Sequence, residues 1–271
     1  MKEVKAKKAL GQHFLNDTDA ARRIAYTISE SELPESAKKW GNLPIVEIGP
    51  GMGVLSRYLL EQRREVKAVE IDGESVQWLS RNMPGLTVVE GDFLATDPSS
   101  LFEGEKALIG NYPYNISSQI FFRVLEYREQ FPVVAGMLQK EVAERICAAP
   151  GGKVRGILSV LLQAWYDCEY LFTVGPEKFT PAPKVQSGVL RLTRNSRVSL
   201  GCDEKLFKKV VKTSFGQRRK TLRNSLSCLV ENKESDKARK LMGSDLMSLR
   251  PERLSVEDFI YLTKEIAGLA G

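Results

Sequence analysis

The stretch LPIVEIGPGMG, residues 43–53, decides the fold. It starts as a continuous apolar run and ends in glycines, a pattern typical of a buried parallel strand that turns into a helix. Glycines allow a sharp backbone turn and the close approach of a ligand. A dinucleotide site is disfavoured, because its G-x-G-x-x-G spacing would need a glycine at Val54, and because Pro50 lacks an N–H that a pyrophosphate could use. The loop glycines are Gly49, Gly51 and Gly53.

Downstream of this stretch, apolar runs alternate with amphipathic stretches, which indicates a doubly wound α/β sheet. The runs are EVKAVEID, LTVVEGD, KALIGNYP and FPVVAGMLQ, and the predicted helices cover 54–63, 73–82, 117–127 and 140–147. After a break at GGKVRG and a helix at ILSVLLQAW, the runs EYLFTVG and SGVLRLT leave little room for a helix between them. They therefore favour an antiparallel excursion at one edge of the sheet.

The character of the chain changes after about Arg194, where basic amphipathic helices are predicted at roughly 203–213, 218–231 and 255–267. The net charge of +6 lies entirely in residues 195–271, which hold 16 Lys+Arg against 10 Asp+Glu. Residues 205–223 carry eight basic side chains and no acid. Such a run is either a solvated helix face or a phosphate-binding surface. We predict two domains, 1–195 and 196–271.

The composition bounds the class of protein. The 271 residues are 42% hydrophobic and 27% charged, which is ordinary for a globular protein. No apolar run approaches the roughly 18 residues of a membrane span, and the basic N-terminus lacks a signal-peptide core. Four widely spaced cysteines and one histidine make a zinc site improbable. We expect a cytoplasmic monomer without a metal or a membrane.

Acidic residues follow the second and third predicted strands. Glu70 stands about 20 residues after the glycine loop, where an acid can accept hydrogen bonds from both hydroxyls of a ribose. Asp92 closes the third strand beside Phe93, and this pair could bind an adenine amine and cover its ring. Each acid alone could equally be a solvated helix cap. Because the carboxyl ends of the strands meet at one edge of the sheet, the ordered set indicates S-adenosylmethionine (SAM).

The stretch IGNYPYNISSQ, residues 109–119, ends the fourth strand at Asn111. The lone pair of an exocyclic base amine is delocalised into the ring, and two acceptors that hold its N–H groups out of plane would release it. The Asn111 side-chain oxygen and the Tyr112 backbone carbonyl can be those acceptors. Pro113 stiffens the loop, and Tyr114 can stack on an extruded base. Since the SAM methyl is already activated, transfer depends mainly on in-line placement. An ordinary Asn-Pro turn with a core tyrosine is the alternative.

These residues carry a resemblance to a family. The chain resembles the small-subunit (16S-type) ribosomal RNA adenine dimethyltransferases, the KsgA type, along nearly its whole length. The matching motifs are GQHFLND, VEIGPGMG, VEID, GDFL, GNYPYNIS, FTPAPKVQSGVLRL and FGQRRKTLRNSL. The resemblance implies a Rossmann-like class I methyltransferase with a seven-stranded sheet and a small helical C-terminal domain. It also implies dimethylation of two adjacent adenosines near the 3′ end of small-subunit rRNA, within the immature small subunit.

The resemblance also implies roles for individual residues. His13 and Leu15 would join Gly49, Gly51, Glu70, Asp92, Phe93 and Asn111 around the cofactor. Phe179 would be the second ring on the target adenine, opposite Tyr114. His13 replaces a common asparagine and Tyr112 a common leucine. Neither change disturbs the assignment, because histidine can hydrogen bond and only the Tyr112 carbonyl is needed. The alternatives are a surface residue at position 13 and a core ring at position 179.

Two other functions share part of this pattern. The large-subunit rRNA adenine methyltransferases have a similar glycine loop and Asn-x-Pro-Tyr loop, but the tail FGQRRKTLRNSL resembles the small-subunit family. A non-catalytic ribosome assembly factor could also keep this fold. On a helix, the tail would leave Arg218, Arg219, Lys220 and Arg223 to contact rRNA phosphates, while Leu222 and Leu226 pack inward. If that surface is only solvated, the next candidates are Lys2, Lys5, Lys7 and Lys8.

Overall fold

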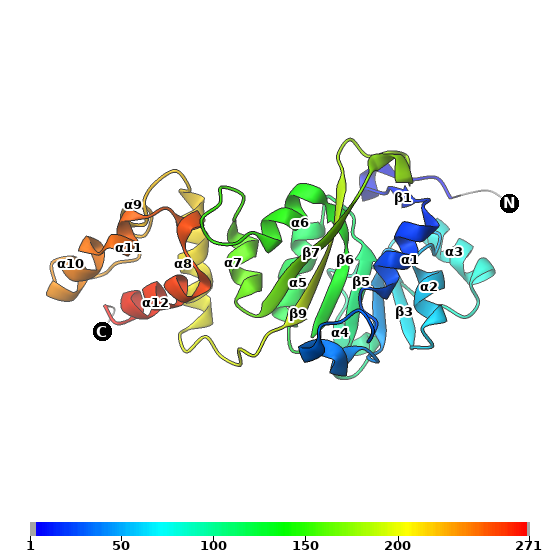
Figure 1. Cartoon of the computed structure of the whole chain (residues 1–271), viewed down its shortest axis with the longest axis horizontal. Coiled ribbons are helices and arrows are strands. Elements are labelled where there is room, and N and C mark those ends of the chain that lie inside the picture. The colour runs from blue at the N-terminus through cyan, green and yellow to red at the C-terminus, as the bar shows by residue number, and fades with distance from the viewer. Residues whose placement is uncertain (1–3, 270–271) are drawn as a thin grey trace. The chain divides into compact units, whose positions relative to one another are not determined.

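A computed structural model of the chain describes residues 4–269, so Lys2 lies outside the described residues (Figure 1). The described chain forms two compact units. Unit 1 contains the residues up to Glu144 together with Asp167–Arg194, and unit 2 contains Arg145–Tyr166 and the residues from Asn195 on. The junction after Arg194 adjoins the predicted domain boundary, whereas residues 145–166 group with the C-terminal residues.

Unit 1 is organised by a seven-stranded sheet with the order β4-β3-β2-β5-β6-β9-β7. Strands β2 to β6 run parallel to their neighbours, while β9 is antiparallel to β6, as predicted for the edge. The interior strand β2 is buried along its whole length, which is why its sequence is a nearly continuous apolar run. The strands are β2 (Ile45–Ile48), β3 (Val66–Glu70), β4 (Thr87–Glu90), β5 (Ala107–Asn111), β6 (Val133–Gln139), β7 (Tyr166–Val174) and β9 (Ser187–Arg194).

The helices between these strands set the position of the site. Right-handed crossovers place α2 and α3 on one face of the sheet and α5 on the other, because the strand order reverses between β2 and β5. That reversal is the topological switch point, where ligands bind in open α/β sheets. The helices are α1 (Thr18–Tyr26), α2 (Ser56–Glu61), α3 (Gly73–Asn82), α4 (Pro98–Leu101), α5 (Ser117–Glu126) and α6 (Lys140–Cys147).

A separate two-stranded sheet ties the N-terminal segment to a distant loop. In it, β1 (Phe14–Leu15) pairs antiparallel with β8 (Phe179–Thr180). The connection continues beyond the strands, since the Asn16 N–H donates to the Lys178 carbonyl at 2.8 Å. The helix α1 that follows is capped by Asp17, whose carboxylate accepts from the Ala20 N–H at 2.7 Å. The sequence motifs did not predict β1, β8 or α1.

From Asn195 on, the described residues fold into helices and no strand. They are α8 (Glu204–Gly216), α9 (Leu222–Ser225), α10 (Asp236–Gly243), α11 (Asp245–Ser248) and α12 (Val256–Ala267), and α7 (Ile157–Gln163) belongs to the same unit. Helix α12 starts with a capping box, in which Ser255 and Asp258 satisfy each other's backbone N–H groups. None of the helices in the described part of the chain is long and apolar enough to cross a membrane.

The helix predicted over residues 218–231 is wrong. The structure has a turn after Gly216, then the short helix α9, and then turns. Tertiary contacts decide this, because the Leu222 N–H donates to the Leu249 carbonyl at 2.8 Å and both Leu222 and Leu226 are fully buried. The leucines therefore pack inward as predicted, although one continuous helix does not carry them. The predicted helices at 203–213 and 255–267 are present as α8 and α12.

Candidate active site

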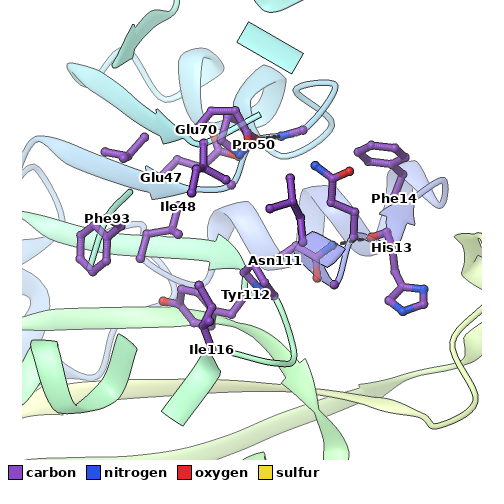
Figure 2. Close-up of a pocket in the computed structure, with 18 of the residues that line it drawn as sticks. His13, Phe14, Glu47, Ile48, Pro50, Glu70, Phe93, Asn111, Tyr112 and Ile116 are labelled. Atoms are coloured by element: carbon purple, nitrogen blue, oxygen red, sulfur yellow. Dashed lines mark hydrogen bonds between the residues drawn. The ribbon is translucent and has the colours of Figure 1, made fainter. Parts of the chain in front are cut away.

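A cavity of about 410 Å³ lies within unit 1 at the carboxyl ends of β2, β3 and β5 (Figure 2). Its walls come from the N-terminal segment, the glycine loop and the ends of successive strands. The predicted residues that line it are His13, Leu15, Gly49, Gly51, Glu70, Asp92, Phe93, Asn111, Tyr112 and Tyr114. The fold thus brings together residues that lie up to about a hundred positions apart in the sequence.

The glycine loop leaves one side of the cavity open to a ligand. Gly49 has φ +62°, and a Cβ added there would meet no heavy atom within 4 Å. Gly51 has φ +57°, and its Cβ would lie 3.0 Å from the Phe14 ring. Both positions therefore need glycine for backbone reasons, and Gly51 also lets the N-terminal segment approach the loop.

Glu70 is the buried acid at the end of β3, with 3% of its surface exposed. Its Oε2 accepts the Gly51 N–H at 3.0 Å, and its Oε1 accepts the Asp72 N–H at 2.9 Å. Burial raises the pKa of Glu70, and these two backbone bonds oppose that shift. Each carboxylate oxygen has a further lone pair, so the group can still accept two hydroxyl donors.

Glu47, on β2, also lines the cavity and was given no role from the sequence. It is 1% exposed, and the Ser56 hydroxyl donates to its Oε2 at 2.6 Å. Burial raises the pKa of Glu47 to about 8, the Ser56 bond opposes this, and the nearby Glu70 adds to it. The side chain is therefore mostly protonated at neutral pH. An acid inside the apolar run LPIVEIG was the signal that could have identified it.

Asp92 and Phe93 line the cavity after β4. The Asp92 carboxylate accepts the Leu94 N–H at 2.9 Å, which fixes the loop. Phe93 is 3% exposed, and its ring centroid lies 6.4 Å from that of Phe131. Most of the Phe93 ring is buried, and the contact of the pair with adenine stays a prediction.

Asn111 ends β5, and its amide has a defined orientation. Its Nδ2 donates to the His13 carbonyl at 3.0 Å, a contact drawn in Figure 2. The reverse orientation would put two oxygens face to face, so Oδ1 is the end that remains to accept a hydrogen bond from a substrate. The N-terminal segment thus orients the Asn111 side-chain amide, which the sequence analysis predicted to bind the target amine.

Tyr112 contributes its backbone to the site and its side chain to the core. The phenol is 1% exposed and donates to the Ala135 carbonyl at 2.7 Å, and burial raises its pKa. A Cβ on Gly136 would lie 2.7 Å from this ring. The absence of a side chain at Gly136 therefore makes room for a tyrosine, rather than a leucine, at position 112. The Tyr112 N–H donates to the Met137 carbonyl at 2.8 Å, which holds the peptide in place.

Tyr114 and His13 form a stacked pair, with ring centroids 5.4 Å apart and an interplanar angle of 29°. The Tyr114 hydroxyl forms a hydrogen bond with the Ser187 hydroxyl at 2.6 Å. Burial raises the pKa of Tyr114, and this hydrogen bond opposes the shift. The His13 Nδ1 lies 2.8 Å from the Pro181 carbonyl and must carry the proton, because a carbonyl only accepts. In Figure 2 the imidazole points away from Glu70.

Among the residues predicted to contact the cofactor or the target adenine, Phe179 does not line the cavity. It is 4% exposed, belongs to the hydrophobic core and pairs with Leu15 across the small sheet. Its role as a second stacking ring therefore stays a prediction.

The predicted RNA-binding residues lie in unit 2, and all are exposed. Arg218, Arg219 and Lys220 occupy the turn after α8, whereas Arg223 lies on α9 and donates through Nε to the Met242 carbonyl at 2.7 Å. The predicted single helical stripe of arginines is therefore wrong. These side chains still form an exposed basic segment, and its binding to RNA stays a prediction.

Comparisons with known proteins identify the family of the chain. The family model described as "Ribosomal RNA adenine dimethylase" matches residues 3–267. The chain belongs to this family. Among its relatives, "Ribosomal RNA small subunit methyltransferase A" of Parabacteroides distasonis is 56% identical over 265 residues, covering 97% of this chain and 94% of the relative. The protein of the same name from Bacteroides thetaiotaomicron is 54% identical, covering 98% and 96%.

Two solved structures share the fold. A dimethyladenosine transferase from Plasmodium falciparum has a TM-score of 0.75 at 23% identity, covering 95% of this chain and 98% of that one. The 23S rRNA methyltransferase ErmE has a TM-score of 0.63 at 26% identity, covering 94% and 99%. The predicted family and the fold class, a seven-stranded methyltransferase sheet followed by a small helical part, are confirmed.

Proposed function

We propose that this protein transfers methyl groups from SAM to the exocyclic amines of two adjacent adenosines near the 3′ end of small-subunit rRNA. The proposal rests on one observation: the Asn111 amide nitrogen is occupied by the His13 carbonyl, and this leaves its oxygen as an acceptor at the cavity. The names of relatives more than half identical over nearly the whole chain support the choice of small-subunit RNA.

The residues of the cavity fit SAM. A volume of about 410 Å³ lies within the usual range for small-molecule sites. The open side of Gly49 admits the methionine part, Glu70 retains lone pairs for both ribose hydroxyls, and Asp92 lies at the next strand end for the adenine amine. When bound, SAM supplies an activated methyl group on its sulfonium.

The protein's own residues would prepare the target amine. Asn111 Oδ1 and the Tyr112 carbonyl would accept its two N–H groups, which pulls them out of the ring plane and frees the nitrogen lone pair. Tyr114 would stack on the extruded base. The base would then replace the His13 ring on one face of the Tyr114 ring. The amine nitrogen would take the methyl group as the methyl–sulfur bond breaks and the neutral thioether is released. The amine proton then becomes acidic and would leave to water, so no general base is required.

We further propose that the substrate is the immature small subunit and that the basic segment of unit 2 contacts rRNA phosphates. The protein would act as a cytoplasmic monomer. The exposed side chains of Arg218, Arg219 and Lys220 and the uneven charge of the chain support the phosphate contact.

Primer extension across the 3′ end of small-subunit rRNA tests the function. Small subunits from a strain that lacks the methylations are incubated with the protein and SAM, and large subunits serve as the matched control. We expect stops at two adjacent adenosines of the small-subunit RNA that require both protein and SAM. Stops confined to large-subunit RNA would favour the function named for ErmE, and no stops on either RNA would favour a non-catalytic assembly role.

A further inference from the structure

The segment from Lys7 to Asn16, here called the strap, forms one wall of the cavity. Every residue from Ala9 to Asn16 lines it. The C-terminal end of the strap is fixed by the pairing of β1 with β8 and by Asn16, whose side chain donates to the Thr180 hydroxyl at 2.5 Å. The other end of the strap needs a fastening of its own, because it has no strand partner among the described residues.

That fastening is a group of three residues, Lys7, Gln12 and Asp72, here called the latch. Lys7 Nζ lies 2.5 Å from Asp72 Oδ1, and Gln12 Nε2 donates to Asp72 Oδ2 at 3.3 Å. The Lys7 N–H donates to Gln12 Oε1 at 2.8 Å, which closes the group. The Asp72 side chain is 1% exposed. Burial favours a higher pKa for Asp72, but its hydrogen bonds, led by that from Lys7, hold the pKa below the usual value.

The latch is connected to both groups that the proposed function uses. On one side, the Asp72 N–H donates to Glu70 Oε1 at 2.9 Å. On the other side, the strap carries the His13 carbonyl that accepts from Asn111 Nδ2 at 3.0 Å. A change at the latch would therefore alter the position of Glu70, the proposed ribose acceptor, directly. It would alter the position of Asn111, the proposed amine acceptor, through the strap.

We propose that Lys7 is a positioning residue, which holds the strap closed over the cofactor cavity through Asp72. Through the strap it also keeps the His13 carbonyl against Asn111. This inference rests on the proposed function for its consequence in SAM binding. It departs from the sequence-based alternative in which Lys7 is one of several N-terminal lysines that contact RNA, because its ammonium group is already committed to a buried carboxylate.

The adjacent lysine offers a matched control. Lys8 carries the same charge and is exposed, and it does not line the cavity. Lys7→Met and Lys8→Met therefore remove equal charge, and only the first should disturb the latch. Calorimetry with SAM, without RNA, should show about tenfold weaker binding for Lys7→Met, the scale of one hydrogen bond to a charged group. Lys8→Met should bind SAM as the wild type does, and Lys7→Arg should restore most of the affinity.

Hydrogen exchange of the cofactor-free protein provides a second readout that does not depend on SAM. Peptides covering the strap should exchange faster in Lys7→Met than in Lys8→Met, while peptides covering α8 should not change. In an Asp72→Asn background, Lys7→Met should affect the strap much less, because the lysine has lost its buried carboxylate and keeps only the exposed Glu74 carboxylate, 3.4 Å away.

The two readouts separate this inference from the proposed function. If the wild type binds SAM and Lys7→Met binds it equally well, the latch has no positioning role. If the wild type does not bind SAM, the proposed function fails, and the exchange data still decide whether Lys7 fastens the strap. Equal strap exchange in the two lysine variants would overturn the inference in either case.

Discussion

The carboxyl-end edge of the sheet in unit 1 and the basic segment in unit 2 were both predicted from short motifs, with different success. At the sheet edge, residues from four successive strand ends line one cavity. In the basic segment, the continuous helix expected over 218–231 is a turn followed by the four residues of α9. Only in the first region did the sequence pattern also predict the arrangement of the side chains in space.

The difference has a physical origin. Parallel strands in register place their carboxyl ends at one edge, so the order of residues along the chain is also their order in space. A helix of basic and apolar residues has no such constraint, because helix propensity is weak and tertiary contacts override it. The bond from the Leu222 N–H to the Leu249 carbonyl is such a contact.

The largest effect on activity should come from Asn111→Ala, which removes a proposed acceptor of the target amine from the sheet-edge site. Losing one preorganised polar contact in a transition state costs on the order of 10²–10³-fold in rate. SAM affinity should fall much less, because Glu70 and Asp92 remain. Single-turnover methyl transfer and calorimetry measure the two effects, with the exposed Asn42→Ala as control. Near-normal transfer would remove Asn111 from the catalytic role.

Glu47→Gln sharpens the comparison, because it tests a sheet-edge residue that the motifs missed. The pKa of Glu47 is raised to about 8 in the folded protein, so the folded state binds a proton that the unfolded state has lost above its ordinary pKa of 4.5. Its contribution to stability is therefore present at acid pH and declines as the pH rises toward 8, by about 1.4 kcal/mol per pH unit.

The glutamine variant should lack this decline and keep the Ser56 bond. Relative to wild type, its free energy of unfolding should rise by roughly 2–3 kcal/mol between pH 5.5 and pH 7.5, as measured by urea denaturation. Parallel pH profiles for the two proteins would show that Glu47 ionises normally.

Glu70→Ala tests the order of strand-end acids from which SAM was predicted. Removing this acceptor should weaken SAM binding by roughly 1–3 kcal/mol, the scale for leaving buried polar groups unpaired. Glu90→Ala is the matched control, since Glu90 is an exposed acid at the end of the next strand. Unaltered calorimetric affinity in Glu70→Ala would exclude the ribose assignment.

The smallest effect is expected in the basic segment, where Arg218→Glu with Arg219→Glu reverses two exposed charges. Binding to the small subunit should weaken several-fold, and the slope of log affinity against log salt should flatten by roughly 1–2, because fewer counterions are released. Lys233→Glu with Lys237→Glu reverses the same charge elsewhere in unit 2 and should change the slope less. Equal slopes for the two double variants would identify the basic segment as a solubilising surface.

Much of the candidate site was predictable, because its residues lie on elements that the sequence defines locally. The glycine loop, Glu70, Asp92 and Asn111 each end an apolar strand, and each lines the cavity. The predictions that fared differently depend on contacts between distant segments. Phe179 follows β7 but packs with Leu15, far away in sequence, and Tyr112 places its ring over Gly136 on the neighbouring strand.

The sequence alone determined the α/β fold, the family and the order of residues around the cavity, because strand periodicity and parallel topology are enough to bring strand ends together. Only the tertiary structure decided the direction of the Asn111 amide, which depends on a carbonyl 98 residues away, and the attachment of Lys7 to Asp72, 65 residues away. Such contacts depend on which separate segments come together in the folded chain, and a local sequence pattern does not predict this.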